Sequence, residues 1–215
     1  MKVEVLEVAG FRGWLESLRK PFREQVRSKI NCSLPYADSF GIGCTGFYIK
    51  FDNKDLALSQ ALIFKGDDHA KALRSIQVWL KIDAPRYFWS ELETYSVGVT
   101  KLPSESTMHT LLKQEVTEDD FEPGTDRKVV QEFISKVHDV REIIAEYPEV
   151  TKTSKRAIKQ ILPEGYLQER VIMYSYQALR NIYFKRRNHD LPEWQVFCKT
   201  IEELPLAKEL IICEK

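Results

Sequence analysis

The segment over residues 126–147 constrains the fold of this chain more than any other. Apolar side chains recur there at spacings of three and four residues, which places them on one face of a helix. Pro148 ends the pattern, because proline lacks the backbone donor that a further helical turn needs. The apolar positions are Val129, Val130, Phe133, Ile134, Val137, Val140, Ile143 and Ile144. We therefore predict a long amphipathic helix whose apolar face belongs to the single core that 215 residues can bury.

The N-terminal part of the chain shows both strand and helix patterns. Residues 2–8 are predicted to form a strand, because apolar side chains alternate with polar ones there. Four further segments follow: a helix, a loop rich in Ser, Gly and Pro, a strand, and a segment that fits either a strand or a short helix. They occupy residues 11–22, 31–46, 47–51 and 56–64, respectively.

Two helices are predicted over residues 68–95. The first covers residues 68–81 and ends before Pro85, because proline disfavours helical geometry in the residue that precedes it. The second has Asp83 as its N-cap and Pro85 just inside its first turn, and it continues to Tyr95.

The rest of the chain is predicted to contain two loops and two more helices. The loops, one rich in hydroxyl groups and one acidic, and the helices, one long and one short, occupy residues 96–108, 115–126, 166–187 and 192–204, respectively. The fold class is therefore α/β or α+β with helices in the majority, and we expect one domain over residues 1–215.

The charge balance excludes one broad class of function. The chain carries 32 basic and 32 acidic side chains, so it lacks the surplus of Lys and Arg that general nucleic-acid binding requires. A local cluster of Arg that holds one phosphate remains compatible with this balance.

The N-terminus and the cysteines favour a cytoplasmic protein. The first ten residues alternate in polarity and do not resemble a secretory leader, and no apolar run is long enough to span a membrane. The cysteines lack metal-ligand spacing, so we expect reduced thiols and no metal; they are Cys32, Cys44, Cys198 and Cys213.

A glycine-rich segment at residues 41–46 matches the G-x-G-x-x-G pattern of dinucleotide-binding proteins. That pattern binds a pyrophosphate only when a strand precedes it and a helix follows it. Here a polar loop precedes it and a strand pattern follows, so we interpret the segment as a plain turn.

The segment from Asp83 to Tyr95 combines an Arg, large aromatic residues, carboxylates and hydroxyls. Helical spacing would place Arg86, Ser90 and Glu93 near one face, which suits recognition of a polar ligand. The more common explanation of such a segment is an aromatic helix packed in a core. A second polar cluster follows within residues 104–109, where an ordinary solvated turn is the favoured interpretation.

The predicted C-terminal helix carries several polar and basic side chains before a turn at residues 188–190. They are Gln177, Arg180, Asn181, Lys185, Arg186 and Arg187. The fixed fork of an Arg guanidinium matches a phosphate group, whereas a solvated basic face is an equally good explanation. The chain contains no nucleophile elbow, Walker loop or His-Glu-x-x-His motif.

At these residues the chain resembles the flavin-dependent thymidylate synthases, the ThyX family. In that family a Leu-Pro precedes a helix carrying Asn and Arg, followed by a turn with Arg and His and then Ala-Gln-Trp-Glu-Ile. The corresponding segments here, in the same order and with similar spacing, are Ile161-Leu162-Pro163, Ala178-Leu179-Arg180-Asn181, Lys185-Arg186-Arg187-Asn188-His189 and Pro192-Glu193-Trp194-Gln195-Val196. The family's Arg-His-Arg signature is absent from the matching place at residues 83–95.

The resemblance implies a helix-rich single domain with a small, mainly antiparallel sheet that binds FAD and the pyrimidine deoxynucleotide dUMP. It also implies a homotetramer that transfers one carbon from methylenetetrahydrofolate to C5 of dUMP, with NADPH as a further co-substrate and the flavin as reductant. The partner would be a small nucleotide, with no nucleic acid and no membrane. The alternative is a non-catalytic protein that binds a nucleotide or another partner and has lost the flavin site.

The resemblance also assigns roles to individual residues. Those expected to bind the substrate are Arg86, Ser90, Glu91, Lys159 and Arg186. Those expected to bind the cofactor are Arg180, Asn181 and His189. No catalytic side chain is assigned, because in this family the flavin carries out the difficult chemical step and the protein binds and orients.

Overall fold

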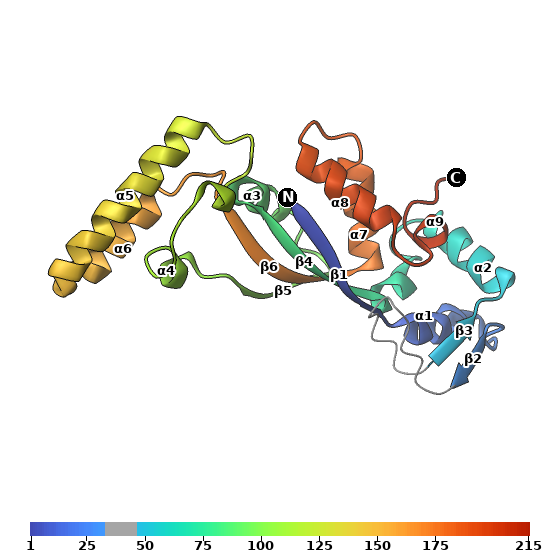
Figure 1. The fold of residues 1–215 in the computed structure, drawn as a ribbon. Coiled ribbons are helices and arrows are strands. Elements are labelled where there is room, and N and C mark those ends of the chain that lie inside the picture. Colours follow the sequence, from blue (N-terminus) through green and yellow to red (C-terminus); the bar gives the residue numbers. More distant parts are fainter. Residues whose placement is uncertain (33–46) are drawn as a thin grey trace. The chain divides into compact units, whose positions relative to one another are not determined.

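The computed structural model of the protein describes residues 1–32 and 47–215 (Figure 1). Most of the loop expected over residues 31–46, including the glycine-rich turn at residues 41–46, lies outside the described residues. The fold is rich in helices and contains a small antiparallel four-stranded sheet, which confirms the predicted fold class. No helix in the described ranges is both long enough and apolar enough to cross a membrane.

The α-helices follow one another with short 3-10 turns between some of them. Their bounds are α1 Phe11–Leu18, α2 Asn53–Ile63, α3 Arg86–Leu92, α4 Thr107–Thr110, α5 Arg127–Glu146, α6 Thr151–Gln160, α7 Tyr176–Arg186, α8 Pro192–Glu202 and α9 Ala207–Leu210. The 3-10 turns are η1 Lys20–Phe22, η2 Lys71–Ser75, η3 Glu118–Asp120 and η4 Pro148–Val150. The predicted helix over residues 126–147 is confirmed as α5, with the Asp126 carboxylate accepting hydrogen bonds from the first-turn N–H groups of Lys128 and Val129. The segment at 56–64, which fitted either type, is part of α2.

The larger sheet has the strand order β1-β4-β6-β5. Its strands are β1 Lys2–Ala9, β4 Gln77–Pro85, β6 Leu167–Ser175 and β5 Val99–Ser104. A separate antiparallel pair joins β2 Lys29–Cys32 to β3 Phe47–Lys50, with Lys29 opposite Lys50 and Cys32 opposite Phe47. The strands predicted at residues 2–8 and 47–51 are thereby confirmed as β1 and β3.

The helix predicted over residues 68–81 is wrong. Only the short turn η2 forms at residues 71–75, and β4 begins at Gln77. Along β4 the buried side chains alternate with half-buried ones, which is the period-two pattern of a strand covered on one face. Asp83 therefore lies inside β4 and does not cap α3, whose N-cap is Pro85. α3 itself is confirmed, although it ends at Leu92 rather than at Tyr95.

The long helix predicted over residues 166–187 is correct only in its second half. Residues 167–175 form β6, and α7 begins at Tyr176, where the Ser175 hydroxyl accepts a hydrogen bond from the N–H of Ala178 at 3.2 Å. The loop predicted over residues 96–108 contains β5 and the start of α4. The helix that begins at Pro192 is confirmed as α8.

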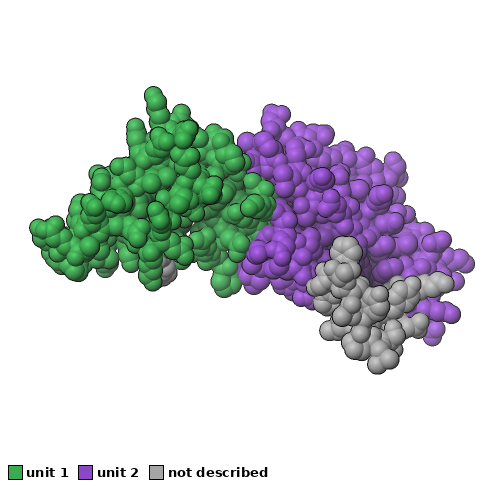
Figure 2. All heavy atoms as spheres, in the orientation of Figure 1, with its two compact units in different colours: residues 1–2, 82–94, 103–170 green, residues 3–81, 95–102, 171–215 purple. Residues whose placement is uncertain are grey.

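The chain divides into two compact units, which Figure 2 colours separately. Unit 1 comprises residues 1–2, 82–94 and 103–170. Its core lies where the apolar face of α5 meets α4, α6 and the segments that flank them. The buried members are Leu111, Val116, Phe121, Val130, Phe133, Val137, Ile158, Leu162 and Tyr166. That residues 1–215 fold as one domain stays a prediction.

Unit 2 comprises residues 3–81, 95–102 and 171–215. Its core is strongly aromatic, with Trp14, Tyr174, Tyr176, Trp194 and Phe197 all 0% exposed. Edge-to-face contacts join several of these rings, including Trp194 with Phe197 at 5.9 Å between centroids. Aromatic side chains thus supply much of the apolar area that holds α1, α7 and α8 in place.

Candidate functional site

The junction between β4 and α3 creates the first part of the candidate site, within unit 1. Phe88, Trp89 and Leu92 fill the buried side of α3. The opposite side carries Arg86 and Ser90 at a spacing of one helical turn. The start of α3 is held in place because the N–H of Arg86 donates to the carbonyl of Tyr166 at 3.1 Å.

A small cavity of about 170 Å³ lies against this side of α3. Its lining residues are Arg86, Trp89, Ser90, Glu93, Glu164 and Arg170. The prediction that Arg86, Ser90 and Glu93 share one face is therefore confirmed. Pockets for complete small ligands usually measure about 300–1,000 Å³, so this cavity suits a compact polar group such as a phosphate or a sugar hydroxyl.

The charges in the cavity balance one another. Arg86 Nη2 lies 3.4 Å from a Glu164 oxygen, and Arg170 Nη1 lies 3.2 Å from a Glu93 oxygen. Both glutamates are more than half exposed, at 60% and 52%, so each ion pair is weak and a stronger anion could displace it. Arg86 is also anchored by a hydrogen bond from Nη1 to the Leu162 carbonyl at 3.1 Å.

Trp89 and Arg170 form the floor of this cavity. The indole Nε1 of Trp89 donates to the carbonyls of Ala84 and Gln168, both at 3.0 Å. The Arg170 guanidinium lies over the indole ring at 4.5 Å from its centroid, in cation–π geometry. Its Nε is buried and has no hydrogen-bond partner in the part of the chain that the structure describes. An acceptor group on a ligand would satisfy this donor.

Sequence reasoning missed Glu164 and Arg170. Arg170 was missed because residues 166–187 were expected to form one helix, and a residue on a strand faces different neighbours from one on a helix. The run Val171–Tyr174 is rich in β-branched and aromatic residues, and it could have revealed the strand. Glu164 follows Pro163 outside any regular element, where spacing rules give no direction.

Three of the five predicted substrate-binding residues do not line this cavity: Glu91, Lys159 and Arg186. Glu91 is half-buried on a different side of α3. Lys159 is exposed near the end of α6. Their predicted roles stay predictions.

Tyr166, whose backbone carbonyl accepts the Arg86 N–H at the start of α3, has a phenol that is neutral near pH 7. Burial and the nearby negative charge of Glu105 raise the pKa of its phenol to about 12. The ring also packs edge to face on Phe121 at 5.5 Å. This residue is therefore a structural support of the junction and not an acid–base group.

A second cluster of predicted site residues lies in unit 2, at the C-terminal end of α7. The guanidinium of Arg186 lies 5.3 Å from the Tyr95 ring centroid and 4.8 Å from that of Trp194. The imidazole of His189 packs against the same Trp194 ring at 6.2 Å, and its Nδ1 accepts a hydrogen bond from the Leu191 N–H at 3.2 Å. Aromatic faces thus fix the positions of a cation and an imidazole on one surface.

Arg180 and Asn181 are neighbours on α7 with different surroundings. Arg180 donates from Nη1 to the carbonyls of Ile211 and Cys213, so it fastens the C-terminal segment to α7. Asn181 is half-buried, and its side-chain amide forms no hydrogen bond with any described residue. Its donor and acceptor groups are therefore available to a ligand.

Comparison with known proteins shows which fold this arrangement belongs to. No protein family and no curated protein matches the sequence. A crystal structure of the flavin-dependent thymidylate synthase ThyX from Helicobacter pylori, complexed with FAD and dUMP, matches with a TM-score of 0.67 and 18% identity over 100% of both chains. A second Helicobacter pylori ThyX structure with FAD and dUMP matches with a TM-score of 0.65 and 18% identity, over 99% of this chain and 98% of that one. The protein therefore has a ThyX-like fold.

Proposed function

We propose that this protein is a divergent flavin-dependent thymidylate synthase-like protein that binds FAD and a pyrimidine deoxynucleotide, dUMP. The observation that carries the proposal is the likeness over the full chain to structures that hold these two ligands. At 18% identity this likeness concerns the fold, so the ligands of this chain rest on its own side chains.

The residues proposed to bind the nucleotide are mostly cations and hydroxyls. Arg86 and Ser90 line a cavity of a size that suits a phosphate or a sugar hydroxyl, and Arg186 is held by two aromatic rings. An Arg fork can bind a phosphate through two parallel hydrogen bonds. Lys159 would supply a further positive charge and Glu91 a carboxylate on the substrate side.

The fit to FAD differs among the three residues predicted to bind it. The amide of Asn181 lacks a partner among the described residues and fits a flavin contact. His189 is held by the Trp194 ring and by the Leu191 N–H, and it is proposed as a cofactor residue from the family resemblance alone. Arg180 fits less well, because it already donates to two backbone carbonyls. When bound, the flavin would supply the hydride that reduces the transferred carbon, with NADPH and methylenetetrahydrofolate as co-substrates.

The visible absorbance spectrum of the purified protein, before and after addition of FAD and dUMP, tests the proposal first. Flavin bands that survive desalting are expected. Replacement of Arg186 by Ala should then weaken dUMP binding at least tenfold, as measured by calorimetry. Arg187→Ala is the matched control, because Arg187 pairs with Glu214 and packs on Phe184, and it should leave the dUMP affinity unchanged. An unchanged dissociation constant in Arg186→Ala would contradict the role of that residue.

A second function is favoured by one specific observation. The Arg-His-Arg signature is absent, and both arginines of the cavity in unit 1 are paired with glutamates. A protein that binds dUMP but shows no flavin bands after addition of FAD and desalting would support a non-catalytic nucleotide-binding or partner-binding role.

Assembly and location are part of the same proposal. A homotetramer is proposed by analogy with the family, and light scattering of the purified protein measures its mass directly. A cytoplasmic location is proposed as well, and cell fractionation tests it.

A further inference from the structure

A basic segment in unit 2 lies outside every site described so far. Residues 19–29 contain five Lys or Arg and a single acidic residue, although the whole chain is neutral. They connect the end of α1 through η1 to β2. Two of these cations, together with Lys54 from α2, line a cavity of about 320 Å³. The described lining residues are Arg19, Phe22, Glu24, Arg27, Lys54 and Leu58.

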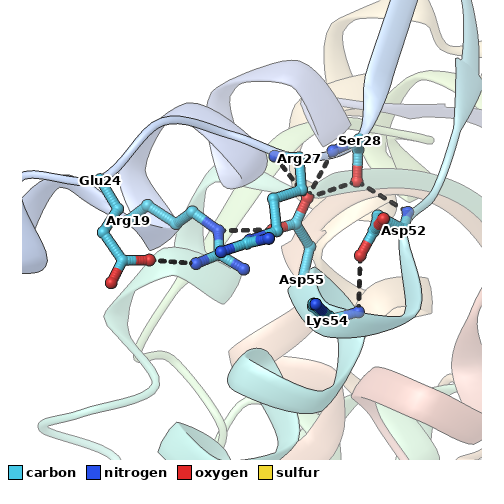
Figure 3. A network of polar contacts seen from close by, with 7 residues as sticks. All are labelled: Arg19, Glu24, Arg27, Ser28, Asp52, Lys54 and Asp55. Carbon is cyan, nitrogen blue, oxygen red and sulfur yellow. Dashed lines mark hydrogen bonds and ion pairs between the residues drawn. The ribbon is translucent and has the colours of Figure 1, made fainter.

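A buried carboxylate connects the segments that line this cavity, and Figure 3 shows its polar contacts. Asp55 is 1% exposed and accepts a hydrogen bond from Arg19 Nε at 2.5 Å. The same carboxylate accepts bonds from the backbone N–H groups of Arg27 at 3.1 Å and Ser28 at 2.7 Å. The Ser28 hydroxyl adds a further bond to it at 2.6 Å. The basic segment is thus hydrogen-bonded to α2 at several points, which holds the backbone that carries its exposed side chains in place.

Positive charge exceeds negative charge in the lining of the cavity. Neither the guanidinium of Arg27 nor the ammonium of Lys54 has a carboxylate partner among residues 1–32 and 47–215, and both side chains are exposed. Asp55 neutralises Arg19 from beneath. Glu24 is the one carboxylate among the described lining residues, and its oxygen accepts a bond from Arg19 Nη1 at 2.5 Å while its side chain stays 52% exposed. An exposed carboxylate on an Arg fork occupies a position that suits a stronger anion.

The same cavity has an apolar wall. Phe22 is 50% exposed although it is a large aromatic residue, and Leu58 lies on the other supporting element, α2. Exposed aromatic faces beside cations suit a ligand that joins an anionic group to an unsaturated ring. Inorganic phosphate alone would leave this wall unused.

We propose that this cavity binds an organic phosphate, with Arg27 and Lys54 contacting the phosphate group, Phe22 and Leu58 contacting its organic part, and Glu24 displaced from Arg19. The site involves none of the residues assigned to FAD or dUMP. It therefore stands whether or not the proposed flavin chemistry is correct.

Phenyl phosphate and inorganic phosphate are the probes, titrated into the full-length protein by calorimetry at low ionic strength. Phenyl phosphate should bind more tightly than inorganic phosphate, and Phe22→Ala should remove that difference. Arg27→Ala and Lys54→Ala should each weaken phenyl phosphate binding about tenfold, which corresponds to roughly 1.4 kcal/mol for one lost charge-assisted bond. Glu24→Gln should strengthen it, because the competing carboxylate is gone.

Two controls separate this site from the proposed nucleotide site. Lys71→Ala removes an exposed cation elsewhere in unit 2 and should leave the affinity unchanged. Arg186→Ala should also leave phenyl phosphate binding unchanged. The proposal is overturned if phenyl phosphate does not bind, or if its binding depends on Arg186 and not on Arg27 and Lys54. Circular dichroism of each variant establishes that the fold is retained, as expected for side chains that do not contact Asp55 directly.

Discussion

At the scale of single residues, the ion pair between Arg19 and Asp55 decides how the segment after α1 is held. Both side chains are almost fully buried, at 6% and 1% exposure. Burial by itself would raise the pKa of the Asp55 carboxyl, but hydrogen bonds from Ser28 and Arg19 outweigh it and hold that pKa below its ordinary value. The folded chain therefore favours the deprotonated form of Asp55 more than the unfolded chain does, which links the stability of the protein to pH.

Replacement of Asp55 by Asn should lower the free energy of unfolding by about 3–5 kcal/mol at pH 7, because Arg19 would stay buried without its counter-charge. The contribution of Asp55 is complete above the unfolded-state pKa of about 3.9 and is lost as the pH falls through the lower folded-state pKa. Urea unfolding between pH 6 and pH 2 should therefore show a steeper loss of stability in the wild type than in Asp55→Asn.

Asp52→Asn is the control for this measurement, because the Asp52 side chain caps α2 by accepting the Lys54 N–H, and Asn caps a helix about as well as Asp. It should change the stability by less than about 1 kcal/mol. Equal losses in the two variants, or identical pH profiles for Asp55→Asn and the wild type, would show that the buried network does not carry the stability assigned to it.

Single residues also show how far the candidate site follows from the sequence. Arg86, Ser90 and Glu93 could be grouped because helical spacing alone fixes which side chains share a face. Glu164 and Arg170 could not, because a loop and a strand bring them to the cavity from distant parts of the chain. The hydrogen bonds of Arg180 to the C-terminal carbonyls could not be predicted either, since they depend on the path of the last residues.

At the scale of elements, the length of the apolar pattern explains why α5 was predicted correctly and β4 was not. The apolar positions of α5 fit only a helical period over many turns. The segment of residues 70–80 is short, and its apolar residues are so closely spaced that they fit either a helical period or the period of two of a strand. Trp79 also adds an apolar residue to the outward face of the strand. The period of two becomes visible only when Ile82 and Ala84 are included beyond the expected helix end.

Ile82 tests that assignment directly. In β4 it is 0% exposed, so Ile82→Ala should destabilise the protein by about 2–5 kcal/mol through lost burial and the cavity left behind. Its neighbour Lys81 points away from the core and pairs with Glu4, so Lys81→Ala should cost less than about 1 kcal/mol. Chemical unfolding of both variants provides the measurement. Similar small losses would mean that residues beyond 81 do not form a core strand.

At the scale of the whole molecule, the chain passes repeatedly between its two compact units. The strands β1, β4, β5 and β6 each contribute residues to both units, so neither unit is one continuous segment. Each of these strands therefore continues from one unit into the other. We expect the chain to unfold in one cooperative transition, as the prediction of a single domain implies.

Ile158→Val makes this expectation measurable. Ile158 is 1% exposed in the core of unit 1, and loss of one methylene there should lower the stability by about 0.5–1.5 kcal/mol. Three of the four tryptophans, Trp14, Trp79 and Trp194, belong to unit 2, so tryptophan fluorescence reports mainly on that unit. If the units unfold together, the substitution in unit 1 should shift the fluorescence midpoint and the far-UV circular dichroism midpoint by the same amount. A shift in circular dichroism with an unmoved fluorescence midpoint would instead make the two units independent domains, because the loss in unit 1 would then leave the stability of unit 2 untouched.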